Sequence, residues 1–362
     1  MRSGRSSRPG SPGWLQPLAL VLRLLVLGVG LGVLTGTVLK QLAPRLAQDA
    51  MNTPRLNTAT SPVALPQRGL PLGRFEPKRE LPALSQRWKA LAAAQKDLKV
   101  GGYLLVLDDG RFAQLDPDVP LPAASAIKTP ILLAGLEDLD AGKLRWNDPL
   151  PLTKEVIGGG AGWMASRPIG TRFPFSEAAT EMIRVSDNTA TNLLIRRLGG
   201  KLALNARFQA LGLDATVLNN WLPDLEGTNT TSPRDLARSI ALVDTGEKLS
   251  PRGRDHFRSI LATSRTNTLL PLGLLKGLGL DSSDPDSELL ARGIAVLNKT
   301  GDIGIAYADA GLIELPNGQR AVAAFMVKGP FNDPRSAELI RAMAAAASET
   351  LVGRSASVPQ PR

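Results

Sequence analysis

Residues 122–134 have the sequence PAASAIKTPILLA, and the rest of the chain can be interpreted outward from this stretch. Small residues precede Ser125 and an apolar helical run follows Lys128, so we expect Ser125 in the first turn of a helix and Lys128 one turn later on the same side. The dipole at a helix N-terminus favours negative charge. A lysine desolvated there can lose its proton near neutral pH and act as base for the serine hydroxyl. A lone Ser-x-x-Lys pair is also common on surface helices.

A second polar triplet, Ser186-Asp187-Asn188, separates two helical runs at 177–185 and 189–197. Ser186 can relay a proton between a lysine and a leaving amine, and Asn188 can donate to a substrate amide carbonyl. Helix capping is the competing interpretation, because Ser, Asp and Asn all cap helices well.

A third triplet, Lys299-Thr300-Gly301, follows the apolar run 294–298, which is typical of a strand that ends there. A lysine between apolar strands is costly unless it has a purpose. Lys299 and Thr300 can hold a substrate carboxylate, and Gly301 lets a ligand approach the backbone closely. An edge-strand lysine before a turn is the alternative.

The segments around these triplets predict an α+β fold. Helices are expected at 85–97 and 337–351, a hairpin at 102–107 and 112–115 around Asp108-Asp109-Gly110, a helical block at 125–245, and strands at 294–298, 306–314 and 320–327, the last two joined by Pro316-Asn317-Gly318. Strands from both ends of the chain would form one antiparallel sheet, covered by helices, with a helical subdomain inserted between them.

The three triplets in this order resemble the class A β-lactamases and penicillin-binding proteins, and the resemblance covers 85–352. It implies a β-lactamase-like, three-layer fold and a serine hydrolase that attacks a β-lactam or related amide. It also implies that Ser125 is the acylated nucleophile and that Lys128 activates it. Ser186 would pass a proton to the leaving nitrogen, with Lys299 nearby.

The same resemblance implies a set of substrate contacts. Asn188, Thr300 and Gly301 would bind substrate, and the backbone N–H groups of Ser125 and Asp302 would form the oxyanion hole. No cofactor or metal is expected.

One loop departs from the class A pattern, in which a Trp-Glu-Pro run supplies the glutamate that activates the deacylating water. The matching stretch is 218–226, where the glutamate position holds Leu222 and a later position holds Glu226. Leucine can neither accept a proton nor order a water, and efficient lactam turnover needs a carboxylate near the ester. Glu226 could reach the same water, or deacylation could rely on Lys128 and be slow.

Two alternatives follow from this departure. A D-alanyl-D-alanine-type peptidase would act on cell-wall peptides and be acylated, but only slowly released, by β-lactams. A catalytically silent wall-binding domain is the other, although a nucleophile beside a base argues against it. Esterase relatives use a tyrosine in place of Ser186, and neither Tyr103 nor Tyr307 lies in the right segment.

Composition excludes several function classes. The 362 residues contain no cysteine and one histidine, His256, in a stretch that predicts a charged helix face, so the usual zinc sites are excluded. Of the net charge of +10, most lies before residue 85, with 11 Lys and Arg against 3 Asp and Glu. The folded part is nearly balanced and aromatics are 4%, which disfavours nucleic-acid binding. We expect a monomer, with a solvated acidic loop at 281–286.

The first 84 residues indicate export. Residues 1–13 are basic, 14–39 are apolar around Arg23, and 40–84 form a Pro-rich polar linker, with a similar tail at 353–362. Such a pattern predicts a membrane anchor with the basic end in the cytoplasm and the catalytic domain on the periplasmic side. A cleaved signal segment and a secreted domain are the alternative.

Overall fold

The computed structural model describes residues 74–352. The basic tail, the apolar segment 14–39, most of the linker and the tail at 353–362 lie outside the described residues. Within the part described, no helix has both the length and the apolar character needed to cross a bilayer.

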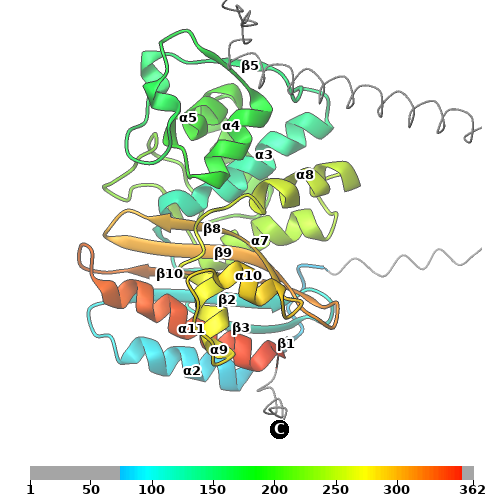
Figure 1. The fold of residues 1–362 in the computed structure, drawn as a ribbon, viewed down its shortest axis with the longest axis vertical. Helices are drawn as coiled ribbons and strands as arrows, with labels where there is room; N and C mark the ends of the chain where they lie inside the picture. Colours follow the sequence, from blue (N-terminus) through cyan, green and yellow to red (C-terminus); the bar gives the residue numbers. More distant parts are fainter. Residues whose placement is uncertain (1–73, 353–362) are drawn as a thin grey trace, which may run out of the picture. The chain divides into compact units, whose positions relative to one another are not determined.

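A six-stranded sheet forms the centre of the described unit, in the order β1-β3-β2-β10-β9-β8 (Figure 1). Its strands are β1 (Arg79–Glu80), β2 (Lys99–Val106), β3 (Arg111–Leu115), β8 (Ala295–Asp302), β9 (Ala306–Glu314) and β10 (Arg320–Lys328). β10 pairs antiparallel with β2, so strands from the two ends of the described unit share one sheet as predicted. The predicted strands all pair antiparallel, and β1, a short edge strand that was not expected, pairs parallel to β3.

Both predicted hairpins are confirmed. The Asp108-Asp109-Gly110 turn joins β2 to β3, and the 315–319 loop joins β9 to β10. Each turn contains a glycine in the left-handed region, Gly110 at φ 76° and Gly318 at φ 80°, where other residues are strained. Turn chemistry therefore explains why these two connections could be predicted.

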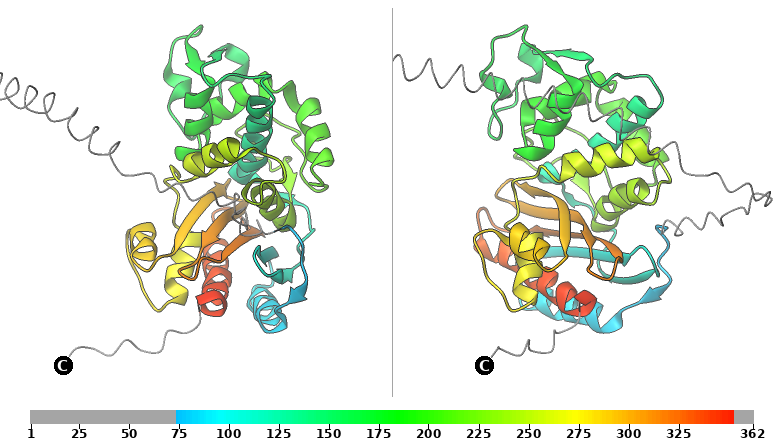
Figure 2. Two further views of the ribbon diagram at one scale, coloured as in Figure 1. Left: turned by 90° about the vertical axis from the view of Figure 1, so that its right-hand side faces the viewer. Right: turned by 45° about the vertical axis from the view of Figure 1, so that its right-hand side comes forward.

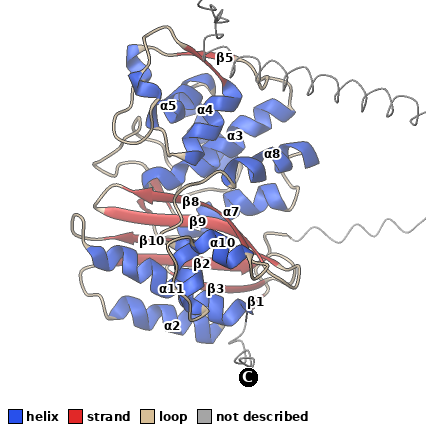
Figure 3. Ribbon diagram, in the orientation of Figure 1, coloured by secondary structure: helices blue, strands red, loops and turns tan. Residues whose placement is uncertain are grey.

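Helices from distant parts of the chain cover one face of the sheet (Figures 1 and 3). These are α2 (Pro82–Ala93), α9 (Leu270–Gly277), α10 (Pro285–Leu290) and α11 (Pro334–Val352). Trp88 on α2 packs edge-on against Phe325 on β10, with ring centroids 5.2 Å apart, and its indole N–H donates to the Met343 carbonyl at 2.9 Å. A buried aromatic with its polar atom satisfied thus holds the first and last helices together.

The helical subdomain lies against the other face, as Figure 2 shows. It contains α3 (Lys128–Asp140), α4 (Phe175–Arg184), α5 (Asn188–Arg197), α6 (Gly200–Ala210), α7 (Pro233–Asp244), α8 (Pro251–Leu261) and the 3-10 turns η1 (Ala124–Ile127), η2 (Lys154–Val156) and η3 (Met164–Ser166). Two short strand pairs were not expected: β4 (Leu121–Pro122) with β7 (Thr230–Thr231), and β5 (Pro149–Pro151) with β6 (Arg172–Pro174). Each pair joins two segments that are distant in the sequence.

Some element boundaries differ from the prediction. The first helix begins at Pro82 rather than residue 85, because proline suits a first helical turn, and it ends at Ala93. The third triplet does not follow its strand but lies within it, since β8 continues to Asp302. The predicted acidic loop leads into α10, which Asp284 caps.

The one histidine also differs from its predicted setting. His256 stacks on Trp146 with ring centroids 4.6 Å apart, so it is half-buried rather than a free member of a solvated helix face. Its neighbour Phe257 is fully in the core. This pairing gives the histidine a structural role.

Candidate active site

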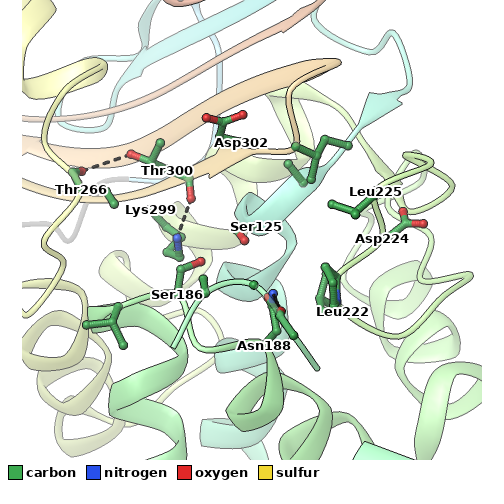
Figure 4. A pocket seen from close by; sticks show the side chains of 17 residues that line it. Ser125, Ser186, Asn188, Leu222, Asp224, Leu225, Thr266, Lys299, Thr300 and Asp302 are labelled. Atoms are coloured by element: carbon green, nitrogen blue, oxygen red, sulfur yellow. Dashed lines mark hydrogen bonds between the residues drawn. The ribbon is translucent and has the colours of Figure 1, made fainter. Parts of the chain in front are cut away.

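The three triplets meet at one cavity of about 580 Å3 between the helical subdomain and strand β8 (Figure 4). Ser125 comes from η1, Ser186 and Asn188 from the junction of α4 and α5, and Lys299 and Thr300 from β8. The lining also includes residues 159–161, the loop 222–225, Thr266, Ala124, Val185, Asp302 and Ile303. Segments far apart in the sequence therefore supply one wall each.

Ser125 is presented on a tight turn. Ala124, the residue before it, has φ 46°, a left-handed conformation that an alanine adopts only when its surroundings force it to. Gly301 packs against this turn so closely that a Cβ added there would lie 2.8 Å from the backbone nitrogens of Ser125 and Ala126. Glycine in the third triplet is thus required for strand β8 to approach the nucleophile.

Lys128 is buried beneath the cavity, and its amine reaches both serines. The Nζ atom lies 3.0 Å from Ser125 Oγ, 2.9 Å from Ser186 Oγ, 2.7 Å from the Ser186 carbonyl and 2.9 Å from Asn188 Oδ1. An ammonium has three N–H donors, so it cannot donate to all four oxygens. A neutral amine can donate to the carbonyl and the amide oxygen and accept from a serine hydroxyl, and this arrangement suits a base.

The environment of Lys128 favours that neutral form. Its side chain is fully buried, and burial, followed by the nearby charge of Lys299, places its pKa well below the usual value, while Asp187 opposes the shift. Burial also lowers the pKa of Lys299 to about 8, with Asp309 acting in the opposite direction. Two buried lysines therefore share one site, and one is far more easily deprotonated than normal.

The second triplet holds its position through its backbone and through Asp187. Ser186 has φ 59°, a left-handed conformation that turns it between the two helices. Asp187 accepts from the backbone nitrogens of Trp163 at 2.7 Å, Met164 at 2.9 Å and Ala190 at 2.8 Å. The capping interpretation is therefore correct for Asp187, which also fixes the loop on one side of the cavity.

Asn188 faces both Lys128 and the cavity wall. Its Oδ1 accepts from Lys128, and its Nδ2 donates to the Gly159 carbonyl at 2.8 Å. An amide nitrogen carries two hydrogens, so one remains for a substrate carbonyl.

The third triplet lines the far end of the cavity. Lys299 donates to the Thr300 carbonyl at 2.5 Å, and the Thr300 hydroxyl lies 3.1 Å from the Thr266 carbonyl, as Figure 4 shows. Thr300 also lies 3.1 Å from Asp309 Oδ2. Asp302 also lines the cavity, and the role of its backbone N–H in an oxyanion hole stays a prediction.

The loop that departs from the class A pattern is held rigidly. Asn192 binds the backbone of Leu222 in both directions, donating to its carbonyl at 2.7 Å and accepting from its nitrogen at 2.9 Å. The Leu222-Pro223 peptide is cis. Leu222 is buried and lines the cavity, whereas Glu226 is exposed and is not among the lining residues. The structure thus puts a leucine at the cavity wall and leaves Glu226 outside it.

Two carboxylates line the cavity, Asp302 and Asp224. Asp224 is engaged with its own loop, accepting from Asn229 N at 2.6 Å and from the Thr228 hydroxyl at 2.8 Å. Across residues 74–352, no group of three or more acidic or histidine side chains is arranged to hold a metal ion.

Sequence reasoning missed three polar residues near the site. Asn192, Asn298 and Asp309 are all buried. Asp309 had a readable signal, a carboxylate within the apolar strand 306–314. Asn192 and Asn298 had none, because an asparagine in a helix or beside a strand end has many ordinary uses.

Comparison with known proteins gives one consistent family. Residues 83–351 match the beta-lactamase enzyme family. The chain is 30% identical to a beta-lactamase of Streptomyces albus G over 47% of this chain and 57% of that protein. It is 26% identical to the extended-spectrum beta-lactamase PER-1 of Pseudomonas aeruginosa over 75% of this chain and 88% of that protein. The matches to the first four curated relatives cover only 57–66% of their length.

Solved structures give a longer match. The structure of PBP-A is 43% identical, with a TM-score of 0.70, covering 76% of this chain and 97% of that one. A leucine-to-glutamate mutant of PBP-A, solved as an acyl-enzyme complex with penicillin G, is 42% identical over 76% of this chain and 98% of its own, also with a TM-score of 0.70. By its family match and by the identity it shares with PBP-A, the chain belongs to the beta-lactamase enzyme family.

Proposed function

We propose that this chain is a serine acyl-enzyme hydrolase that a β-lactam acylates at Ser125. The observation that carries the proposal is the position of the Lys128 amine, fully buried and within 3.0 Å of both the Ser125 and the Ser186 hydroxyl oxygens. A nucleophile, a base of lowered pKa and a second hydroxyl in contact with that base are the parts that amide acylation needs.

The reaction follows from these contacts. Neutral Lys128 takes the Ser125 proton as Oγ attacks the lactam carbonyl, and the resulting oxyanion is stabilised by the backbone N–H groups of Ser125 and Asp302. Ser186 then gives its proton to the lactam nitrogen and is reprotonated by Lys128. The C–N bond breaks and leaves an ester on Ser125. Lys299 and Thr300 hold the substrate carboxylate during these steps.

Release of the acyl group is the slow step in this proposal. Leu222 occupies the cavity wall where class A enzymes carry a glutamate, and Asp224 already accepts two hydrogen bonds from its own loop. Asp302, the other lining carboxylate, accepts from Gly304 N at 2.8 Å, so neither carboxylate stands at the Leu222 position beside the ester, and Glu226 would have to move in from outside. Glu226 as a deacylating base stays a prediction.

A fluorescent penicillin separates the possible outcomes. We expect a stoichiometric, long-lived label on the protein, with little product release, and no label on Ser125→Ala. Fast release would instead show a working carboxylate, and Glu226→Gln should then prolong the label. A D-alanyl-D-alanine peptide, offered in parallel, tests the cell-wall substrate. Absence of label on the wild-type protein would support the silent binder and end the proposal.

We also propose that residues 14–39 anchor the chain, with the catalytic domain outside the cytoplasm as in the periplasmic prediction. The support is the apolar run itself, preceded by Arg2, Arg5 and Arg8. Full-length protein should stay in the membrane pellet after an alkaline carbonate wash. Replacing Leu31 and Val33 by arginine should release it, and release of the unaltered chain would favour a cleaved signal.

A further inference from the structure

A carboxylate that the proposed reaction does not use lies directly behind Thr300, at the end of the cavity where the substrate carboxylate would bind. Asp309, on β9, is fully buried. Its Oδ2 accepts from Leu270 N at 2.9 Å, from Thr300 Oγ1 at 3.1 Å and from Asn298 Nδ2 at 3.1 Å, and its Oδ1 accepts from Asn298 Nδ2 at 2.9 Å. Every partner is a donor, so these hydrogen bonds satisfy an ionised carboxylate.

The charges around Asp309 are few. β8 supplies Lys299, whose positive charge lowers the pKa of Asp309, whereas β10 places Phe325 opposite it. The start of α9 supplies only a backbone N–H. Charged side chains on the covering helices are engaged elsewhere: Lys276 and Arg341 with Glu338, and Asp286 with Asn267.

The Thr300 hydroxyl connects this carboxylate to the cavity. It has a single proton and two candidate acceptors, the Thr266 carbonyl and Asp309 Oδ2, each 3.1 Å away. With Asp309 ionised, the Thr300 hydroxyl donates to Asp309, because an unprotonated contact with a charged carboxylate oxygen is more repulsive than one with the neutral Thr266 carbonyl, which already accepts from Asn298 Nδ2 at 3.0 Å. A substrate anion that binds at Thr300 must take this same proton.

Two effects then act on Asp309 in the same direction. Loss of the Thr300 donor removes a hydrogen bond that favours the charged form, and the new anion adds a like charge nearby. Protonation of the Asp309 carboxyl removes the repulsion between the two anions, and donation from that carboxyl to Thr300 Oγ1 restores the lost hydrogen bond. Burial already raises the pKa of Asp309 to about 6, so a modest further rise brings it into the neutral range.

We propose that Asp309 takes up one proton from water when an anionic group of a ligand binds at Thr300. Asp309 is then a positioning residue that sets where the Thr300 hydroxyl proton points, and it links recognition of the substrate carboxylate to pH. This inference rests on the proposed function, which places that carboxylate at Thr300.

Calorimetry of benzylpenicillin binding to Ser125→Ala, in buffers of different ionisation enthalpy, measures the proton uptake directly. The pH is set about one unit above the Asp309 pKa, so that Asp309 is mostly ionised before the ligand binds. Binding of the anion can also add some protons to Lys299, and we expect most of one further proton to be taken up by Asp309. Asp309→Asn should remove this further uptake. The methyl ester of the same penicillin, which has no carboxylate, should bind without it.

Thr300→Val provides a second test that leaves Asp309 in place. It should lower the proton uptake substantially, and combining it with Asp309→Asn should add little. Unchanged uptake in both single variants would overturn the inference while leaving acylation of Ser125 intact. No binding to Ser125→Ala, together with no label on the wild-type protein, would instead remove the proposed function and this inference with it.

Discussion

At the scale of single residues, the chemistry depends on an amine kept neutral inside the protein. Lys128 has no exposed surface, and a neutral amine there can donate to two of its four oxygen partners and accept from one of the two serine hydroxyls. Burial is the main cause of its lowered pKa. The amine is therefore available in its neutral form at neutral pH because of its burial more than because of any single neighbour.

Removing that amine should stop acylation without unfolding the domain. We expect Lys128→Met, which keeps the length and is apolar, to slow Ser125 acylation by about 10²–10⁴-fold, the usual contribution of a general base. The measurement is the rate of fluorescent-penicillin labelling at saturating reagent. Lys89→Met, an exposed lysine on α2, is the matched control and should label normally. A Lys128→Met protein that labels at the wild-type rate would exclude lysine as the base.

The two lysines also predict a bell-shaped pH profile of acylation for an anionic β-lactam. Lys128 must be neutral, so the rate falls as pH drops through its lowered pKa; Lys299 must stay charged to hold the carboxylate, so the rate falls as pH rises through about 8. Because the two charges interact, the apparent values belong to the pair.

A variant checks the sign of that interaction. Lys299→Gln removes the positive charge that helps to lower the Lys128 pKa, so the acid limb should move to higher pH and the alkaline limb should disappear. Stopped-flow labelling across the pH range gives both limbs. An acid limb that moves to lower pH would contradict this assignment.

The proposed function predicts that Leu222 sets the lifetime of the acyl-enzyme. Leu222→Glu places a carboxylate at the cavity wall, held by the same two Asn192 hydrogen bonds to the backbone. We expect release of the penicilloyl group to become faster by about 10²-fold or more, which is within the usual range for a general base. Leu222→Gln is the matched control with the same shape and no base. Equal lifetimes in the two variants would show that deacylation is limited by something other than the missing carboxylate.

At the scale of elements, the junction between α4 and α5 positions the site through one carboxylate. Asp187 caps α5 and also holds the backbone at 163–164, so a single side chain ties the start of the helix that carries Asn188 to the neighbouring loop. A buried acceptor of three N–H groups leaves all three unsatisfied when it is removed.

Asp187→Ala should therefore be much more destabilising than loss of an ordinary cap. We expect the free energy of unfolding to fall by about 3 kcal/mol, because hydrogen bonds to a charged group and the donors left behind both contribute. Asp284→Ala, which removes the exposed cap of α10, should lower it by about 1 kcal/mol. Denaturant unfolding of both variants makes the comparison, and equal losses would contradict the structural role given to Asp187.

Local patterns explain which elements could be predicted from the sequence. The two hairpins carry turn glycines, and the strand at 306–314 matches β9 residue for residue because the Pro-Asn-Gly turn follows it closely. The short pairs β4–β7 and β5–β6 have two or three residues each, too few to show a period. The extension of β8 through Lys299 was missed because lysine and glycine normally mark a strand end.

At the scale of the whole described unit, the site exists only because strands from both ends of the chain share one sheet. β10 joins β2 to β9 and β8, so the triplet on β8 is brought against the turn that carries Ser125, 174 residues earlier. The motifs predicted that the three triplets converge. The contacts that keep them there, through Asn192, Asn298 and Asp309, depend on tertiary packing that no local pattern records.

Intact-protein mass spectrometry after exposure to benzylpenicillin, followed by peptide mapping, tests the central claim most directly. Ring opening adds the whole penicillin without losing a fragment, so we predict one adduct of the full penicillin mass per chain, located on Ser125, that persists for long times in the wild-type protein and is absent from Ser125→Ala. An adduct on another residue, or none on a folded wild-type chain, would contradict the account.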